Sequence, residues 1–203
     1  MHSIYLDSPD LSLYQHTING DKNRFKLRLR CYEEDEDRPV FFEIKRRVDN
    51  TIHKKRVAVR RQAVEDLLAG YAPPPGSLVH ETPAALEALD TFTELVHRLG
   101  AVPQSHVCYQ REAWVETAGN SVRVTIDRNV LTEPRDTVWF DTSMTDAVAV
   151  FGDAVILELK FTARYPTWFN HLVQAFGLRQ RSAAKYVDGI ERLTESGLLY
   201  ALS

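Results

Sequence analysis

The chain has 203 residues, 44% apolar and 26% charged, which is typical of one globular domain with a sizeable core and excludes disordered and collagen-like chains. No apolar run approaches the roughly 20 residues of a membrane-spanning helix, no leader segment is visible, and Cys31 and Cys108 are too few for a disulfide framework, so we expect a cytoplasmic protein. The formal net charge of −3 argues only weakly against a polyanionic partner, because the charges are unevenly distributed.

Short runs with alternating apolar and polar side chains predict β-strands along most of the chain. They cover residues 3–6, 24–32, 40–48, 52–59, 107–117, 122–128 and 154–161. Turn residues separate several of these runs, as at Asp49-Asn50 and Gly119-Asn120. Antiparallel β-structure is therefore expected to dominate the fold.

Three helices are expected between and after the strands. Residues 82–100 begin with Thr-Pro, place apolar side chains on one helix face and end with Gly, which predicts a helix with a capped start. Residues 166–176 predict a second helix, and Ser182 is expected to cap a third helix that carries Lys185. The Pro-Pro-Pro-Gly stretch at 73–76 is interpreted as a linker inside one domain.

Basic residues gather in one part of the chain. Residues 21–61 hold 14 Lys and Arg against 8 Asp and Glu, whereas residues 62–110 hold one base, Arg98, against six acids. Five of the acids in the basic segment form one run at 33–37, which predicts a solvated turn between two strands. The strands on either side of this turn therefore keep an excess of positive charge.

Alternate positions of the predicted strands bring these charges to one face. In residues 24–32 that face carries four basic side chains at a spacing of about 6.6–6.8 Å: Arg24, Lys26, Arg28 and Arg30. The charged side chains at matching positions of the other strands are Glu43, Lys45, Arg47, Lys54, Arg56, Arg111, Arg123, Asp127, Glu158 and Lys160. Like charges on paired strands destabilise a sheet unless an anion lies among them.

Two interpretations of this charged face stay open. It is either the solvated side of an ordinary sheet or the inner lining of a closed sheet that holds a polyanion. Closure concentrates the charge, and the arginine guanidinium matches phosphate oxygens bidentately. Nucleic acid is a poor fit, because few aromatic side chains beyond Tyr32, Phe41 and Tyr109 share the face to stack on bases. A phosphate chain without bases explains the composition better.

Eight segments taken in order resemble the vacuolar transporter chaperone (VTC) domain, the polyphosphate polymerase branch of the triphosphate tunnel metalloenzymes, also called CYTH-like proteins. They are residues 3–10 (SIYLDSPD), 24–30 (RFKLRLR), 42–47 (FEIKRR), 54–56 (KKR), 109–111 (YQR), 122–128 (VRVTIDR), 156–161 (ILELKF) and 182–186 (SAAKY). Each segment alone is a weak signal, whereas the ordered set with its spacing covers nearly the whole chain. Residues 1–203 are accordingly expected to form a single domain of this type.

The resemblance implies an α+β fold with an antiparallel β-barrel of about eight strands, a triphosphate tunnel, and helices packed outside it. It implies a metal-dependent phosphotransferase that moves the γ-phosphate of ATP onto inorganic polyphosphate, with Mn²⁺ or Mg²⁺ as cofactor. Two alternatives stay open. One is hydrolysis of triphosphate or a nucleoside triphosphate in the same tunnel, and the other is a non-catalytic module that binds polyphosphate.

The resemblance also assigns residues. The phosphate-binding side chains that it carries over are Arg28, Arg30, Lys45, Lys54, Arg111, Arg123 and Lys185, of which Arg28, Arg30, Lys45 and Lys54 are expected to be catalytic. It implies Glu158 as the metal ligand. The strand alternation adds Arg56 and Lys160 to the phosphate-binding set and Glu43 as a second metal candidate, whereas an ion pair with a neighbouring base is favoured for Asp127. One carboxylate can suffice for a hard cation that bridges phosphate oxygens.

The sequence departs from its relatives at the start, where they carry a further strand before the segment that matches residues 3–10. The barrel is therefore expected to lack its first strand. Either the natural product is longer, or the barrel is open along one edge, or residues 137–141 or a partner chain close it. Because an unpaired edge promotes association, a homodimer is expected.

Overall fold

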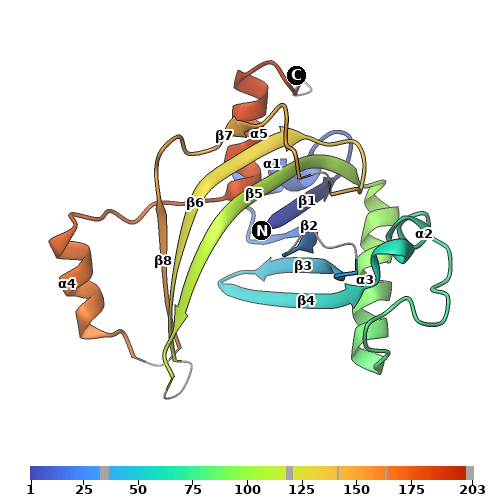
Figure 1. Cartoon of the computed structure of the whole chain (residues 1–203), viewed down its shortest axis with the longest axis horizontal. Helices are drawn as coiled ribbons and strands as arrows, with labels where there is room; N and C mark the ends of the chain where they lie inside the picture. Colours follow the sequence, from blue (N-terminus) through green and yellow to red (C-terminus); the bar gives the residue numbers. More distant parts are fainter. Residues whose placement is uncertain (33–36, 118–120, 141, 163, 200–203) are drawn as a thin grey trace.

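The computed structural model describes residues 1–32, 37–117, 121–140, 142–162 and 164–199, and its fold is α+β (Figure 1). Within these ranges an eight-stranded antiparallel sheet curls around a hollow, and five α-helices accompany it. The expected fold class is therefore confirmed. The acidic turn predicted at 33–37 lies almost entirely outside the described residues.

The strands are β1 (His2–Asp7), β2 (Asn23–Cys31), β3 (Val40–Val48), β4 (Thr51–Val59), β5 (Val102–Val115), β6 (Val122–Pro134), β7 (Val148–Ala149) and β8 (Ile156–Phe161). Along the sheet the order is β4-β3-β2-β1-β5-β6, and both β7 and β8 pair with β6. Every predicted strand overlaps an observed one. Strand β7 was not predicted, because its two residues are too few to show an alternation.

The helices are α1 (Ser12–Ile18), α2 (Val64–Leu68), preceded by a 3₁₀ turn at Arg61–Ala63, α3 (Pro83–Leu99), α4 (Thr167–Ala175) and α5 (Lys185–Glu195). The predicted start of α3 is confirmed, because the Ala85 N–H donates to Thr82 Oγ1 at 3.1 Å. The cap predicted for the third helix is wrong. α5 follows Ala184, which leaves Ser182 two residues too early to cap it. In the described part of the chain, every helix is too short or too polar to span a membrane.

The main apolar core covers the convex face of the sheet. Leu27 and Phe42, from β2 and β3, are at most 1% exposed, and α3 packs over this face with Phe92, whose ring centroid lies 4.8 Å from that of Phe42. Burying each such side chain contributes about 1.5–3 kcal/mol. This core fixes the register of the strands, and with it the positions of the charged side chains on their opposite face.

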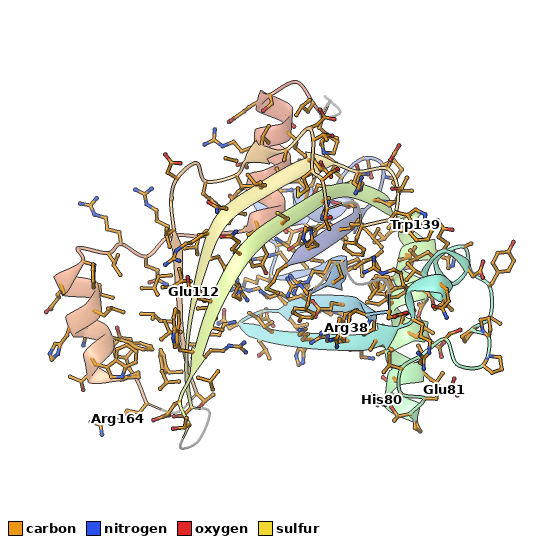
Figure 2. All side chains as sticks on the ribbon, viewed as in Figure 1. Arg38, His80, Glu81, Glu112, Trp139 and Arg164 are labelled. Atoms are coloured by element: carbon orange, nitrogen blue, oxygen red, sulfur yellow. The ribbon has the colours of Figure 1, made fainter. Side chains whose placement is uncertain are left out.

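The register aligns those charged positions in rows across the concave face. In one half of the sheet the rows are Arg24–Arg47, Lys26–Lys45–Lys54 and Arg28–Glu43–Arg56, and in the other half they include Arg123–Lys160 and Thr125–Glu158. Other charged side chains, such as Glu81 and Arg164, lie at the periphery of the molecule (Figure 2). The predicted division of each strand into a charged and an apolar face is therefore confirmed.

The expected barrel is not closed. β4 and β8 form the two edges of the sheet, and in the described ranges neither pairs with a further named strand on its outer side. The expectation that residues 137–141 close the sheet is wrong for 137–140, because Val138 and Phe140 pack against the convex core instead. Asp141 lies outside the described residues.

One helix departs from the expected position outside the sheet. α5 packs on the concave side, where the Tyr186 ring stacks on Tyr5 with centroids 4.8 Å apart. Val187 and Ile190 join these rings in a second buried cluster with Val107 from β5. α5 thereby becomes part of the wall of the hollow, because apolar side chains from β1 and β5 remain on the concave face to receive it.

Candidate functional site

A cavity of ≈ 560 Å³ occupies the concave face of the sheet. Its described lining contains ten Lys and Arg side chains but one acidic side chain, Glu158. The basic residues are Arg24, Lys26, Arg28, Arg30, Lys45, Arg47, Arg111, Lys160, Arg181 and Lys185. Clefts lined by one sign of charge concentrate ligands of the opposite sign, so this cavity is suited to a multiply charged anion.

Glu43 lies behind this lining and holds three cations in place. Its Oε2 accepts a hydrogen bond from Arg28 Nε at 2.6 Å, and its Oε1 lies 2.9 Å from Lys54 Nζ and 3.3 Å from Arg56 Nε. Burial tends to raise the pKa of Glu43, but the positive charges of Arg28 and Arg30 outweigh it and hold the pKa below its ordinary value. Glu43 is therefore a buried, ionised carboxylate.

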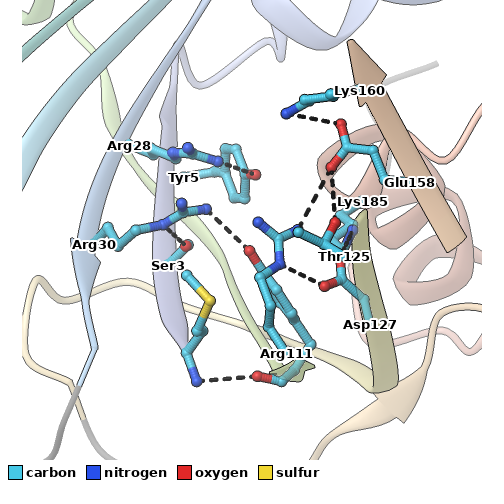
Figure 3. A network of polar contacts seen from close by, with 12 residues as sticks. Ser3, Tyr5, Arg28, Arg30, Arg111, Thr125, Asp127, Glu158, Lys160 and Lys185 are labelled. Atoms are coloured by element: carbon cyan, nitrogen blue, oxygen red, sulfur yellow. Dashed lines mark hydrogen bonds and ion pairs between the residues drawn. The ribbon is translucent and has the colours of Figure 1, made fainter. Parts of the chain in front are cut away.

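Arg28 and Arg30 project from β2 and are further fixed by hydroxyl groups of β1 and β5 (Figure 3). Arg30 Nε donates to Ser3 Oγ at 3.1 Å and its Nη2 to the Tyr109 hydroxyl at 3.2 Å, while Arg28 Nη1 lies 3.3 Å from the Tyr5 hydroxyl. Burial tends to raise the pKa of Tyr5, but neighbouring cations, Arg28 first, lower it to about 8. Both guanidinium groups are thus oriented before any ligand binds.

A second carboxylate organises the part of the site formed by β5, β6 and α5. Asp127 accepts two hydrogen bonds from Arg111, from Nε at 2.6 Å and Nη2 at 2.7 Å, and its Oδ2 lies 2.7 Å from Lys185 Nζ. Burial tends to raise the pKa of Asp127, but the hydrogen bonds from Arg111 and Lys185 lower it below its ordinary value. The ion pair favoured for Asp127 is therefore observed.

Glu158 is the carboxylate that faces the cavity itself. Its Oε1 lies 3.0 Å from Lys160 Nζ, while its Oε2 lies 3.9 Å from Arg111 Nη2 and accepts from Thr125 Oγ1 at 3.4 Å. Its side chain is 41% exposed, which leaves room for a further ligand. In the described part of the chain, no three His, Cys, Asp or Glu side chains converge to hold a metal ion by themselves. A cation here would need ligand oxygens besides Glu158.

The two halves of the site face each other across the hollow. In Figure 3, Arg28 and Arg30 on β2 stand opposite Glu158 and Lys160 on β8, with Arg111 between them. Burial lowers the pKa of Lys45, and Arg28, Lys160 and Glu158 are all close enough to act on it as well. An anion in this space is therefore approached by cations from several strands at once.

The structure brings most of the predicted residues together. Those that line the cavity are Arg28, Arg30, Lys45, Arg111, Lys160, Lys185 and Glu158. Lys54 and Arg56 lie behind it on their shared partner Glu43. Arg123 is the exception. It lies opposite Lys160 in the register, but its side chain is exposed and is not part of the lining.

Several lining residues were not among the predicted site residues. Alternation placed Arg24 and Lys26 on the charged face, so a signal for them existed. No such signal exists for Arg181, which lies in the segment before α5, or for Tyr186, which reaches the cavity only because α5 packs on the concave side.

Comparison with known proteins adds an independent finding. The family model of the VTC domain matches residues 1–194. The matched range includes every residue that lines the cavity, together with Glu43 and Asp127 behind it. A search of curated proteins finds no match to the chain.

Proposed function

This chain belongs to the VTC domain family, which is associated with polyphosphate metabolism, and we propose that it is a metal-dependent phosphotransferase acting on ATP and inorganic polyphosphate. The cavity carries this proposal, because its described lining sets ten basic side chains against one acid. A linear phosphate chain bears negative charge on every unit. It therefore matches a cationic lining that continues over several strands.

In the proposed reaction, a terminal phosphate oxygen of the acceptor chain attacks the γ-phosphorus of ATP. The bond between that phosphorus and the β,γ-bridging oxygen breaks, the acceptor gains one phosphate, and ADP leaves. No protein nucleophile is required, because positioning and charge stabilisation supply most of the catalysis in phosphoryl transfer.

The roles of the basic side chains follow from how they are held. Arg28 and Arg30 would orient phosphate oxygens through their guanidinium groups, which are already fixed by Glu43, Ser3 and Tyr109. Fixing these groups in advance reduces the side-chain entropy that is lost when the ligand binds. On the other walls, Lys45, Arg111, Lys160 and Lys185 would neutralise the charge of the transferring group and of the leaving ADP.

Glu158 is the better of the two predicted metal ligands. Three cations lie within 3.3 Å of the buried Glu43 carboxylate, whereas Glu158 has one cation as close as that, Lys160. Glu158 is also 41% exposed and faces the space where phosphate oxygens would lie. Carboxylate and phosphate oxygens are the ligands that Mg²⁺ and Mn²⁺ prefer. When bound, such an ion would neutralise phosphate charge, and we assign it to Glu158.

The proposal is tested by incubating the protein with ATP, Mn²⁺ and a short polyphosphate primer. Chain length is followed by gel electrophoresis, and ADP and free phosphate are measured in parallel. We expect chain growth with one ADP formed per phosphate added. Release of free phosphate without growth would instead establish a hydrolase, and binding without turnover a polyphosphate-binding module.

Matched variants connect the activity to the cavity. Arg30→Met and Lys160→Met are expected to lower turnover by about 100-fold, because each removes a cation that faces the reacting phosphates. Arg98→Met removes an exposed charge from α3 and should leave turnover unchanged. Lys160 is itself exposed, so loss of activity in that variant does not arise from unfolding. Full activity in both cavity variants would contradict the proposal.

A further inference from the structure

The chain from the end of β8 to α5 carries a group of aromatic side chains, the aromatic patch, that is not part of the cavity lining. Phe169 of α4 lies at its centre and is 1% exposed. The rings of Phe161, Tyr165 and Trp168 surround it, with centroids 6.2, 5.6 and 4.4 Å from its own. These three residues are 44%, 43% and 47% exposed. The aromatic patch is therefore one continuous apolar surface that is open to its surroundings.

α4 extends the aromatic patch with an apolar face of its own. Side chains four residues apart share one face of a helix, so Trp168, Leu172 and Phe176 form a single row. Phe176, the residue that follows α4, is 71% exposed. Of the nine residues of α4, all of them described, Phe169 alone is buried, and Figure 1 shows the helix standing apart from the sheet beyond β8. The described chain therefore leaves this apolar row largely uncovered.

The charged residues next to this row in the sequence are all basic. Residues 159–187 contain five Lys and Arg but no Asp or Glu, although 28 of the 203 residues of the chain are acidic. Arg164 and Arg179, which lie on either side of α4, are exposed and are not part of the cavity lining. Aromatic rings flanked by basic side chains are typical of helices that lie in a membrane interface, where the rings enter the headgroup region and the bases attract anionic lipids.

We propose that α4, together with the aromatic patch, binds the surface of a membrane that contains anionic lipids. Trp168 and Phe176 would enter the headgroup region, while Arg164 and Arg179 would pair with lipid phosphates. A helix of nine residues is about 14 Å long, less than half of the roughly 30 Å hydrocarbon core, so α4 would lie along the surface instead of crossing it. Because the aromatic patch lies outside the cavity, this interaction goes beyond the proposed function and does not depend on it.

Charge favours a lipid surface over a second copy of this chain as the occupant. A symmetric dimer brings the same surface of both copies together, so Arg164 and Arg179 of one copy would share an interface with those of the other. Like-charge repulsion opposes such a dimer, whereas anionic lipids attract both arginines.

The test measures co-sedimentation of the protein with phosphatidylcholine vesicles, with and without phosphatidylglycerol as the anionic lipid. Wild type is expected to bind the anionic vesicles. The double variant Trp168→Ser, Phe176→Ser should bind them about 100-fold more weakly, because each ring contributes buried apolar area in the membrane. The matched control, Tyr71→Ser with Trp139→Ser, removes two aromatic side chains that are 67% and 53% exposed elsewhere on the surface, and it should bind as wild type does.

Two further measurements separate charge from apolar contact. Arg164→Gln with Arg179→Gln should weaken binding to anionic vesicles by about 30-fold and leave binding to phosphatidylcholine vesicles unchanged. In a protein that carries Trp114→Phe and Trp139→Phe, Trp168 is the remaining tryptophan. Its fluorescence should shift to shorter wavelength on anionic vesicles, because the ring leaves water.

Excess tripolyphosphate at matched ionic strength should not displace the protein from vesicles. Displacement would show that the cavity holds the lipid phosphates, and would overturn the proposal. Equal vesicle binding by wild type and the Trp168→Ser, Phe176→Ser variant, or no binding by wild type, would overturn it as well. If wild type instead formed dimers that this variant lost in analytical ultracentrifugation, without binding vesicles, the surface would belong to a second copy. Each of these outcomes leaves the proposed function intact.

Discussion

Glu43 illustrates at the scale of one residue how a cationic site can be built into a stable protein. Three cations approach its two oxygens within 3.3 Å, and its side chain is 1% exposed. Without this carboxylate, the charges of Arg28, Lys54 and Arg56 would repel one another across neighbouring strands. The same ion pairs that fix the Arg28 guanidinium group therefore also stabilise the sheet.

Replacing Glu43 with Gln is expected to destabilise the protein by about 3 kcal/mol at pH 7, because it leaves the partly buried Arg28 without its counter-charge. The pKa of Glu43 is lower in the folded protein than its ordinary 4.5. Its contribution is therefore complete above pH 4.5 and is lost as the pH falls through the lowered pKa. Urea unfolding of wild type and variant, at pH 7 and at about pH 3, measures both effects.

The exposed acid Glu87, which pairs with Lys55 on the surface, provides the control for this experiment. Glu87→Gln should change stability far less at pH 7, because water screens an exposed pair. If Glu43→Gln cost the same at both pH values, the ion pairs would not be the source of the stabilisation.

Residue type and strand alternation predicted most of the cavity but could not assign every role. Alternation alone placed Arg28, Lys45 and Glu158 on the charged face, as observed. It could not show that Glu43 is engaged by cations while Glu158 is half-exposed, because that depends on which strands become neighbours. Arg123 has the same alternation as the others but lies outside the lining, whereas Lys160, directly opposite it in the register, is part of the lining, so alternation alone does not decide which side chains reach the cavity.

At the scale of elements, α5 is held by a network centred on a buried carboxylate of β1. The Tyr186 hydroxyl donates to Asp7 Oδ2 at 2.6 Å, and Asp7 also accepts the N–H groups of Leu13 at 2.8 Å and Tyr14 at 2.9 Å. Asp7 therefore joins β1, α1 and α5. Burial, with a further contribution from Asp7, raises the pKa of Tyr186, so its hydroxyl remains protonated and able to donate.

Tyr186→Phe is expected to lower stability by about 2 kcal/mol, since it removes a hydrogen bond to a buried charged group while keeping the ring. For a chain of this length the corresponding fall in Tm is about 4–8 °C. Thermal unfolding monitored by circular dichroism measures it, with Tyr71→Phe as the control because that side chain is 67% exposed. Equal Tm values for the two variants would show that the Asp7 hydrogen bond does not hold α5.

The two longest helices differ in how far local sequence determines them. The start of α3 at Thr82 and its end at Gly100 follow from capping preferences, and both are observed. α5 begins after Ala184, and no side-chain hydrogen bond caps it. Its position comes from Tyr5 and Asp7, which lie about 180 residues earlier in the chain. Contacts over such separations leave no local signal, so neither its start nor its side of the sheet was predicted.

At the scale of the whole molecule, the number of strands determines how the sheet could close. From β4 through β1 and β6 to β8 there are seven strands, each antiparallel to its neighbours. The two edge strands therefore run in the same direction, and one further strand antiparallel to both would complete a barrel. Sequence patterns predict strands but not closure, which depends on tilt and register. Association of two chains through these edges stays a prediction.

The concentration of like charge in one cavity also affects the stability of the whole molecule. Among the described residues, ten basic side chains and one acid line a cavity of ≈ 560 Å³, so folding brings together charges that the unfolded chain keeps apart. Part of the folding free energy is therefore opposed by repulsion. A polyanion that binds only the folded chain removes this repulsion and adds its own binding free energy.

Tripolyphosphate at about 100 times its Kd should therefore raise Tm by about 5–10 °C at low ionic strength. The shift should shrink as NaCl rises, because the Debye length falls from about 10 Å at 0.1 M to about 3 Å at 1 M and the ligand's attraction to the more distant cations is screened first. Scanning calorimetry over this salt range measures both effects, with monophosphate at matched ionic strength as the control. A shift that did not change with salt would mean that the ligand is held by local hydrogen bonds alone, and that the summed charge of the cavity contributes nothing to its affinity.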